Sequence, residues 1–465
     1  MTMHRLRAEM LVDRPIDEVF DFFSRPENLG RITPPGLGFE LRSSDTAMRD
    51  GLEIEYRIRP LLGIPVGWRS RVADYDPPHG FRDIQVEGPY RSWDHRHAFV
   101  AEGDRTRIVD AVEYSLPLGP LGELAHSVVR GQLEEIFRHR ARTIQSIFAR
   151  PGSCENPLTV AVAGGSGFVG GGIAAELFAR GHRVVVLSRQ GEAARGPLPD
   201  SVEVRHADAT EADGLADALT GVDALVIALA FKNSPMESPA HGQTFMEVDA
   251  AGTERLVAAA QQAGVGHLVY LSGAGAAPNA RRLWFLAKWR AEEAVRGSGI
   301  TWTILRPTWI YGPRDVSLNR FIGFARQLQV VPMTNSGGQL LAPLFIDDVA
   351  RLAADCLTDP AARGQVFEVG GPQTMRLRDI ITRALIVAGI RRPIVPGPSA
   401  LIRLGAIPLT LLPVPPLTPD AVDFINQPAT VDVSPLLERM PRRLTPLDEG
   451  LATYLGRTGD QVLVS

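Results

Sequence analysis

A glycine-rich stretch at residues 164–170, Gly-Gly-Ser-Gly-Phe-Val-Gly, constrains this chain more than any other feature of its sequence. The apolar run before it, residues 158–163, predicts a buried strand, and the run through Ile173 and Leu177 after it predicts a helix. Another apolar run at 183–187 follows at the spacing of a strand–helix–strand unit. Glycines at such a bend let the chain turn sharply and let a phosphate approach the N–H groups that begin the helix. The stretch therefore predicts a dinucleotide-binding turn.

The composition is that of a globular protein with more than one domain. The chain has 465 residues, of which 45% are hydrophobic, and a net charge of −4, so it has no overall attraction to nucleic acid or to anionic lipid. Its two cysteines, Cys154 and Cys356, lie far apart and have neither disulfide-framework nor metal-ligand spacing. Residues 1–14 lack the apolar core of a signal peptide, and no apolar stretch reaches the ~20 residues that span a bilayer. We therefore expect a cytoplasmic protein without a nucleic-acid partner.

The first part of the chain, up to residue 150, predicts a meander of antiparallel strands between two helices. Residues 52–59 alternate apolar and charged side chains, which is the period of a strand with one face in water. Further strand-like runs, separated by turn residues, cover 65–76, 80–88, 92–101 and 105–116. One helix is expected to begin at Asp13-Arg14-Pro15 and a long one to cover 121–149. The interruption at 151–156 predicts a linker between a domain over 1–150 and a second domain over 157–457.

Residues 12–23 (VDRPIDEVFDFF) and 26–29 (PENL), with this order of elements, resemble the opening of the START-like helix-grip family. That family includes polyketide cyclases and coenzyme-Q-binding proteins. The resemblance covers about residues 1–150 and implies an α+β domain whose antiparallel sheet surrounds a long C-terminal helix. It also implies an apolar cavity for a hydrophobic small molecule such as a lipid, a quinone or a polyketide-like compound. Four aromatic residues are candidates to line the cavity, with a structural role in the core as the alternative for each: Trp68, Tyr90, Trp93 and Phe99.

Two histidines, His95 and His97, are expected on one face of the same strand, as two ligands of a metal ion would be. The sequence offers neither a carboxylate nor a third histidine at a useful spacing from them. We therefore predict no metal site.

From residue 157 onward, strands and helices alternate, which predicts a doubly wound parallel sheet with helices on both faces. Strands are expected near 158–163, 183–187, 202–206, 223–229, 267–272 and 301–305. Helices are expected near 168–180, 211–219, 245–263 and 282–297. The whole chain is thus expected to be an α+β helix-grip domain followed by an α/β Rossmann domain with a small C-terminal substrate or lid region.

This second part resembles the extended and atypical branches of the short-chain dehydrogenase/reductase superfamily over about residues 157–457. The resemblance depends on several motifs together, namely the glycine triplet of 164–170, Asp208-Ala209-Thr210, 248–253 (VDAAGT), 306–313 (RPTWIYGP) and 343–350 (PLFIDDVA). It is similar to the atypical branch that includes the Rossmann-fold accessory subunit of respiratory complex I and related bacterial proteins. It implies binding of a nicotinamide dinucleotide.

The end of the second strand of this part, Ser188-Arg189, favours NADP over NAD. An NAD site usually places a carboxylate here for the ribose 2′-hydroxyl, whereas the Arg189 guanidinium suits a 2′-phosphate, and a solvated surface arginine is the alternative. The resemblance also implies that Asp208 binds the adenine amine. The residues expected to hold the cofactor are Gly164, Gly165, Ser166, Gly167, Phe168, Val169, Gly170, Ser188, Arg189, Asp208, Ala209, Ala228, Leu229, Ala230, Ser272, Lys288 and Pro307.

The catalytic positions depart from the pattern of the superfamily. That pattern is a Tyr-x-x-x-Lys pair on one helical face, with a Ser or Thr after the fifth strand. Here Lys288 is in place, but Trp284 stands where the tyrosine is expected, and an indole N–H is no proton shuttle near neutral pH. Ser272 is the candidate hydroxyl partner, although Ala274 occupies the position often used in the extended branch. Both departures weaken the prediction of hydride-transfer catalysis.

One other phenol, Tyr311, follows the sixth strand and is a candidate proton donor, with a pocket-shaping role as the alternative. Tyr270 and Tyr454 are expected to be structural. Arg281 and Arg282 precede Trp284 and are candidates to bind an anionic substrate or to be solvated residues at a helix start.

The proline-rich apolar segment 393–418, which includes Pro413 to Pro416, suits a lid, a contact with a membrane or partner, or a buried packing segment. Three functions remain open at this point. The first is an NADP-dependent oxidoreductase or epimerase-like enzyme that acts on a hydrophobic substrate bound with help of the START-like domain. The others are a non-catalytic protein that binds NADP(H) for structural or redox-sensing purposes, and a lipid or quinone carrier. The substrate and the oligomeric state stay open.

Overall fold

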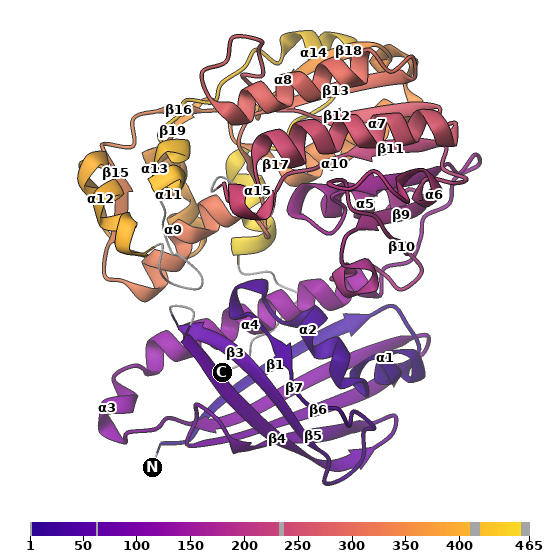
Figure 1. Cartoon of the computed structure of the whole chain (residues 1–465). Coiled ribbons are helices and arrows are strands. Elements are labelled where there is room, and N and C mark those ends of the chain that lie inside the picture. The colour runs from indigo at the N-terminus through magenta and orange to yellow at the C-terminus, as the bar shows by residue number, and fades with distance from the viewer. Residues whose placement is uncertain (1, 62–63, 232–236, 410–418, 457–465) are drawn as a thin grey trace. The chain divides into compact units, whose positions relative to one another are not determined.

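The computed structural model describes residues 2–61, 64–231, 237–409 and 419–456, which divide into two compact units (Figure 1). The first unit spans residues 2–149, and the second covers 150–409 and 419–456. Within the described residues, none of the helices has the length and apolar character needed to cross a membrane.

The first unit is built on one seven-stranded antiparallel sheet with the order β1-β7-β6-β5-β4-β3-β2. Strands β2 to β7 follow one another as neighbours, and β1 pairs with β7, so that His4 lies opposite Tyr114. The expected meander is therefore present, with β1 as an additional edge strand. The strands are β1 (His4–Val12), β2 (Glu40–Leu41), β3 (Glu53–Leu61), β4 (Ile64–Asp76), β5 (Gly80–Glu87), β6 (Ser92–Glu102) and β7 (Arg105–Ser115).

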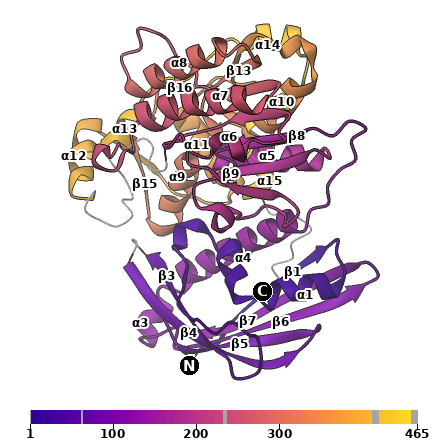
Figure 2. The ribbon, with the colours of Figure 1, turned by 45° about the vertical axis from the view of Figure 1, so that its right-hand side comes forward.

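Helix α4 (His126–Ile147) provides the apolar side chains that complete the core of this sheet (Figures 1 and 2). Its buried residues Leu133, Phe137 and Ile144 belong to one cluster with sheet residues such as Ile108 and Val112. The helix expected over 121–149 is divided into a short α3 (Pro120–Glu123) and the longer α4. The other helical segments are α1 (Ile16–Phe23), η1 (Pro26–Asn28), α2 (Leu29–Ile32) and η2 (Pro35–Leu37).

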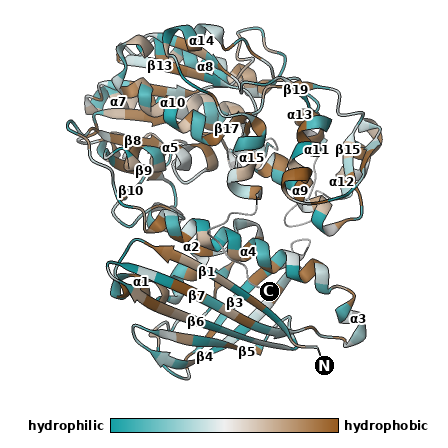
Figure 3. Ribbon diagram, turned by 180° about the vertical axis from the view of Figure 1, so that it is seen from behind, coloured by the Kyte–Doolittle hydropathy of each residue, from teal (hydrophilic) through white to brown (hydrophobic). Residues whose placement is uncertain are grey.

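The aromatic residues singled out in the sequence lie together inside the first unit. Trp68, Trp93 and Phe99 are buried, and Tyr90 is partly buried against the same cluster. The ring centroids of Trp68 and Trp93 are 5.3 Å apart, and those of Tyr90 and Trp93 are 4.9 Å apart. Figure 3 shows hydrophobic and hydrophilic residues alternating along strands of this sheet, as expected for one face on a core.

A polar cluster is buried in the same interior, and it corrects one step of the sequence analysis. His95 and His97 share the inner face of β6, and β7 places Asp110 directly opposite His97. The Asp110 Oδ1 atom lies 2.8 Å from His95 Nε2 and 2.9 Å from His97 Nδ1. Burial and the neighbouring His95 lower the pKa of His97 to about 3. The premise that no carboxylate accompanies the histidine pair was wrong, because the partner comes from another strand.

The second unit contains a seven-stranded sheet with the order β10-β9-β8-β11-β12-β13-β18, in which every neighbouring pair is parallel. Its central strands β8 and β11 are almost entirely buried, as a parallel sheet covered on both faces requires. The doubly wound sheet predicted from the sequence is confirmed. The strands are β8 (Thr159–Ala163), β9 (Arg183–Ser188), β10 (Glu203–His206), β11 (Ala224–Ile227), β12 (His267–Leu271), β13 (Thr301–Pro307) and β18 (Gln365–Val369).

Helices cover both faces of this sheet. On one face α6 (Leu215–Ala218), α7 (Gly252–Ala263) and α8 (Leu283–Arg296) share a core with the strands. On the other, α5 (Phe168–Ala179) and α10 (Ile346–Thr358) pack against each other and against the strands. The single helix expected over 245–263 begins with a π-helical segment, η5 (Phe245–Ala251), before α7.

The remaining elements of the second unit are short and follow the last crossovers. The β pairs are β14 (Ile310–Tyr311) with β17 (Leu344–Phe345), β15 (Val331–Thr334) with β20 (Ile394–Gly397), and β16 (Leu340–Leu341) with β19 (Met375–Arg376). The helical segments are η3 (Gly191–Ala194), η4 (Pro239–His241), α9 (Val316–Gln327), η6 (Pro360–Ala362), α11 (Leu377–Val387), α12 (Ser399–Leu409), α13 (Pro419–Ile425), α14 (Ser434–Arg439) and α15 (Leu447–Leu455).

Truncation of a buried side chain of α4 tests the core of the first unit. Phe137 is only 5% exposed, so Phe137→Ala is expected to lower the free energy of unfolding by about 3–5 kcal/mol. Urea unfolding followed by tryptophan fluorescence measures this change. Val128→Ala, at an exposed position of the same helix, is the control and should change stability by less than about 0.5 kcal/mol. Equal effects of the two variants would show that α4 does not complete this core.

Candidate cofactor site

The glycine-rich turn joins β8 to α5 and is shaped by contacts that leave no room for side chains. Gly164 has a φ of +81°, and a Cβ atom there would lie 2.4 Å from the carbonyl oxygen of Ala228. A Cβ atom at Gly170 would lie 2.3 Å from the carbonyl oxygen of Gly164. α5 begins at Phe168, so its first N–H groups, which have no acceptor within the helix, face the turn. This backbone cradle fits the pyrophosphate of a dinucleotide.

The end of β9 carries the two side chains predicted to choose between the dinucleotides. Ser188 is buried, and its hydroxyl oxygen accepts a hydrogen bond from the backbone N–H of Gln190 at 3.2 Å. Arg189 is exposed, and within the described residues no carboxylate or carbonyl pairs with its guanidinium. A surface arginine held by no protein partner is available to a ligand anion.

Asp208 follows β10 and stabilises the turn that it begins. Its Oδ1 atom accepts hydrogen bonds from the Thr210 N–H at 2.9 Å and from the Thr210 hydroxyl at 2.7 Å. The next residue, Ala209, packs closely on Gly252, where an added Cβ would come within 3.3 Å of it. These contacts fix the backbone at the carboxyl edge of the sheet, where ligands bind in this fold.

Lys288 is held by three acceptors around its ammonium group. Its Nζ atom lies 3.0 Å from Asp249 Oδ1, 3.0 Å from the Leu229 carbonyl oxygen and 3.3 Å from the Leu271 carbonyl oxygen. Two of its three N–H donors make the carbonyl hydrogen bonds, and the charge pairs with Asp249. Burial alone would lower the pKa of Lys288, but Tyr270 and Asp249 outweigh burial and raise it. Lys288 therefore stays protonated and fixed.

Trp284 lies one helical turn before Lys288, at the position expected for a tyrosine. Its ring packs 5.8 Å from Phe245 and 5.7 Å from Phe424, measured between ring centroids. The Arg282 guanidinium lies 5.5 Å from the Trp284 ring centroid. The indole N–H is buried and has no acceptor among the described residues. An indole packed among other aromatic rings thus occupies the position of the expected tyrosine.

The hydroxyl of Ser272 donates a hydrogen bond to a buried ion-pair cluster. Ser272 Oγ lies 2.5 Å from Glu292 Oε1, and Glu292 is fully buried. Arg306 donates to both oxygens of Glu292, at 2.8 and 2.7 Å, and Arg296 donates to Glu292 as well. The Ser272 hydroxyl is therefore engaged with Glu292.

The structure corrects the expectation for Tyr311. This side chain is fully buried in the core of the C-terminal elements, and its hydroxyl donates to the Leu447 carbonyl oxygen at 3.4 Å. The hydroxyl is therefore engaged within the protein core, where burial also raises its pKa. Tyr270 and Tyr454 are buried, as predicted for structural residues, and burial raises the pKa of Tyr270 to about 12 against the opposing effect of Lys288.

Two polar residues that contact the candidate site are absent from the sequence prediction. Asp249 lies on η5, and π-helical segments are frequent at functional sites. The signal for Asp249 was present in the VDAAGT motif but could not be read as a partner of Lys288. Arg314 donates from Nη2 to the Ser166 carbonyl oxygen at 3.1 Å, so its guanidinium lies at the glycine turn.

The expected lid segment is described only in part. Residues 394–397 form β20, and α12 follows with Leu401, Leu404 and Ile407 exposed. Residues 410–418, including Pro413 to Pro416, lie outside the described residues. Arg281 and Arg282 are exposed, and Pro307 is a buried residue of β13.

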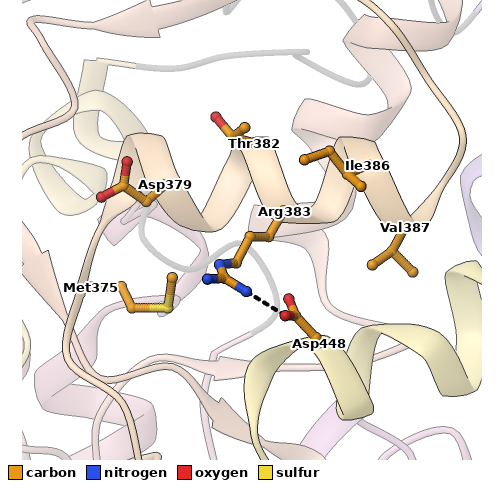
Figure 4. Close-up of a pocket in the computed structure, with 7 residues that line it drawn as sticks. All are labelled: Met375, Asp379, Thr382, Arg383, Ile386, Val387 and Asp448. Atoms are coloured by element: carbon orange, nitrogen blue, oxygen red, sulfur yellow. Dashed lines mark hydrogen bonds and ion pairs between the residues drawn. The ribbon is translucent and has the colours of Figure 1, made fainter.

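A pocket of about 620 Å³ lies beside α11 and α15 (Figure 4). Asp379, Thr382 and Arg383 of α11 line it, and Arg383 forms an ion pair with Asp448 of α15. None of the residues predicted to hold the cofactor lines this pocket. It is therefore a feature separate from the dinucleotide cradle.

The ion pair of Lys288 gives a direct test of this geometry. Lys288→Met leaves Asp249 buried without its partner and is expected to lower the free energy of unfolding by about 3–5 kcal/mol. Adding Asp249→Asn should recover part of that loss, as urea unfolding of the single and double variants would show. Arg290 lies on the same helix as Lys288 and forms an exposed ion pair with Glu254 of α7, so Arg290→Met should lower the free energy of unfolding by under about 1 kcal/mol. Additive effects of Lys288→Met and Asp249→Asn would contradict the pairing of Lys288 with Asp249.

Comparison with known proteins agrees with the cradle. A family described as NAD(P)H-binding matches residues 164–360. A (4-alkanoyl-5-oxo-2,5-dihydrofuran-3-yl)methyl phosphate reductase of Streptomyces griseus is 31% identical over 231 residues, 47% of this chain and 70% of the relative. A chloroplastic divinyl chlorophyllide a 8-vinyl-reductase of Oryza sativa is 30% identical over 232 residues, 46% of this chain and 54% of the relative.

The match covers only part of some relatives. An uncharacterized protein of Mycobacterium tuberculosis is 25% identical over 53% of this chain and 25% of its own length, and the plant reductases are matched over about half of theirs. Among solved structures, the UDP-glucuronic acid 4-epimerase of Bacillus cereus in complex with UDP-glucuronic acid and NAD has the same fold. It is 18% identical over 64% of this chain and 98% of the epimerase, with a TM-score of 0.52. The chain therefore belongs to the same family as the Streptomyces griseus reductase, and its residues 164–360 match the NAD(P)H-binding family.

Proposed function

We propose that this chain is an NADP(H)-dependent reductase that acts on a hydrophobic substrate. The observation that carries the preference for NADP(H) is the exposed Arg189 guanidinium at the end of β9, to which no described residue is paired. A 2′-phosphate gives that guanidinium a charge-assisted partner, which the 2′-hydroxyl of NAD does not. Ser188 and Asp208 at neighbouring strand ends complete the set that would hold the adenosine half.

The glycine turn and Lys288 define the rest of the proposed cofactor site. The cradle around Gly164 and Gly170 would hold the pyrophosphate, and the backbone after β11, at residues 228–230, would border the nicotinamide ribose. Bound NADPH supplies a hydride. Lys288, fixed by Asp249 and two carbonyl groups, contributes a positive charge at this edge of the sheet.

The replacement of the phenol by Trp284 favours one class of substrate over another. Reduction of a ketone requires a proton donor for the oxygen that receives the electron pair, and neither Trp284 nor the buried Tyr311 is suited to that task. When a carbon–carbon double bond is conjugated to a carbonyl, the hydride of NADPH adds to the β-carbon and the electron pair of the double bond is delocalised as an enolate. The α-carbon of the enolate then takes a proton, which solvent can supply. We therefore propose a conjugated carbon–carbon double bond as the hydride acceptor. Relatives named as reductases of a dihydrofuran phosphate and of a vinyl group are consistent with this class.

The first unit is proposed to be a START-like domain that binds the hydrophobic substrate or a related ligand. Support comes from its seven-stranded antiparallel sheet, from the long α4 that shares its core, and from the cluster of Trp68, Tyr90 and Trp93. Aromatic side chains offer large apolar contact areas to flat hydrophobic ligands.

Removal of the Arg189 guanidinium tests the cofactor preference. Arg189→Ala is expected to weaken NADPH binding about 10- to 100-fold, because one or two charge-assisted hydrogen bonds are lost, and to leave NADH binding unchanged. Isothermal titration calorimetry measures both affinities. Arg183→Ala, an exposed arginine at the other end of β9, is the matched control and should bind NADPH like the wild type. If Arg189→Ala and Arg183→Ala bind NADPH equally well, Arg189 does not recognise the 2′-phosphate.

The proposed substrate class is tested by oxidation of NADPH. The wild-type protein is expected to oxidise NADPH in the presence of a hydrophobic α,β-unsaturated ketone and not with the corresponding saturated ketone, as the loss of NADPH absorbance would report. Trp284→Tyr, which restores the phenol, is expected to gain activity on the saturated ketone. Tight NADPH binding without turnover of either ketone would instead indicate a non-catalytic NADP(H)-binding protein.

A further inference from the structure

The interior of the first unit holds two histidines and one carboxylate that the proposed chemistry of the second unit does not use. We propose that His95, His97 and Asp110 bind a divalent transition-metal ion, with Zn²⁺ as the reference ion. Two imidazoles and one carboxylate are a donor set that suits zinc and its neighbours in the first transition series.

The sheet places these three side chains on one face by its register. His95 and His97 are two residues apart on β6, so both point inward, and Asp110 of β7 is the cross-strand partner of His97. One ligand atom from each residue lies within 4.8 Å of the other two. An ion at ~2.0–2.2 Å from each atom requires ligand atoms about 3–3.5 Å apart. The observed 2.8 and 2.9 Å separations from Asp110 Oδ1 thus need only a small adjustment.

One nitrogen atom of the cluster lacks a hydrogen bond, and coordination to a metal ion would give it a partner. His97 Nδ1 is buried and 2.9 Å from Asp110 Oδ1, yet it makes no hydrogen bond of acceptable angle. All three residues are almost fully buried, with exposed fractions of 4%, 4% and 2%. A buried nitrogen without a partner is costly, and coordination to an ion removes that cost.

A second carboxylate lies on the same inner face. Asp83 of β5 is the cross-strand partner of His95, and its Oδ1 atom is buried without a hydrogen-bond partner. The guanidinium of Arg140 on α4, which is also buried, lies over the rings of Phe23 and Phe137. The two strands that flank the histidine strand therefore each offer carboxylate oxygens to a cation on this face.

Three protein ligands would leave positions on the ion open, which is the arrangement of catalytic rather than structural zinc sites. The ring of Trp93 lies 6.0 Å and that of Phe137 5.5 Å from the ring of His95, measured between centroids. An open position beside these aromatic rings would accept an oxygen atom of a hydrophobic ligand. The proposed metal site therefore gives the aromatic cluster a polar anchor.

Metal content of the full-length protein tests the proposal. Wild-type protein from zinc- or cobalt-supplemented medium, purified without chelator, is expected to hold about one ion per chain by elemental mass spectrometry. The cobalt form is expected to show ligand-field absorption of a nitrogen- and oxygen-ligated ion. His97→Asn and Asp110→Asn, which nearly preserve side-chain shape, should reduce the bound metal at least tenfold. His79→Asn, at a histidine outside the cluster in the same unit, should retain it.

The folding of each variant is checked by circular dichroism and by NADPH binding to the second unit, which the substitutions in the first unit should leave unchanged. Wild-type protein without bound zinc and without cobalt absorption would overturn the proposal, whatever the variants do. So would His97→Asn or Asp110→Asn protein that folds and holds as much metal as the wild type.

Discussion

The close approach of the glycine turn to the end of β11 is the constraint on which the second unit depends. At Gly164 the backbone passes so near the Ala228 carbonyl oxygen that a single methyl group would collide with it. This approach lets α5 begin directly above the carboxyl edge of the sheet, where its first N–H groups have no acceptor within the helix and would suit a phosphate. The positions of Ser188, Asp208 and Lys288 around the same edge follow from the parallel order of the strands.

The same edge departs from the catalytic pattern of the superfamily that the sequence resembles. Lys288 is retained, and its ammonium group pairs with Asp249 and donates to two backbone carbonyl groups. Trp284 extends an aromatic cluster with Phe245 and Phe424 instead of offering a phenol. The lysine of the pattern is therefore retained, whereas the phenol that would give a proton to a substrate oxygen is replaced by Trp284. The substrate proposal depends on that difference.

Local patterns in the sequence were sufficient for most of the fold. The run 183–187 matches β9, and the expected helix 282–297 matches α8, because period and end signals are local properties of the chain. The glycine turn was predicted for the same reason. The division between α3 and α4 and the π-helical start at 245–251 were not predicted, since both depend on packing.

The site was predicted less completely, because its side chains meet across elements. Asp249 and Lys288 are 39 positions apart (288 − 249), and only the packing of η5 against α8 brings them together. Asp110 meets His97 through strand register, which no spacing along the chain reveals. Tyr311 follows a strand end as expected, but the C-terminal elements bury it beneath Leu447. The sequence thus predicted the glycine turn between β8 and α5, whereas partners that are distant in the sequence were not predicted.

The central claim is that the glycine turn and the end of β9 hold a nicotinamide dinucleotide phosphate. Hydrogen–deuterium exchange of the full-length protein with and without NADPH tests it most directly. The account predicts slower exchange of the amides at residues 165–170 and 188–190 when NADPH is present, with a smaller effect from NADH at 188–190. Unchanged exchange at the glycine turn under saturating NADPH would contradict it.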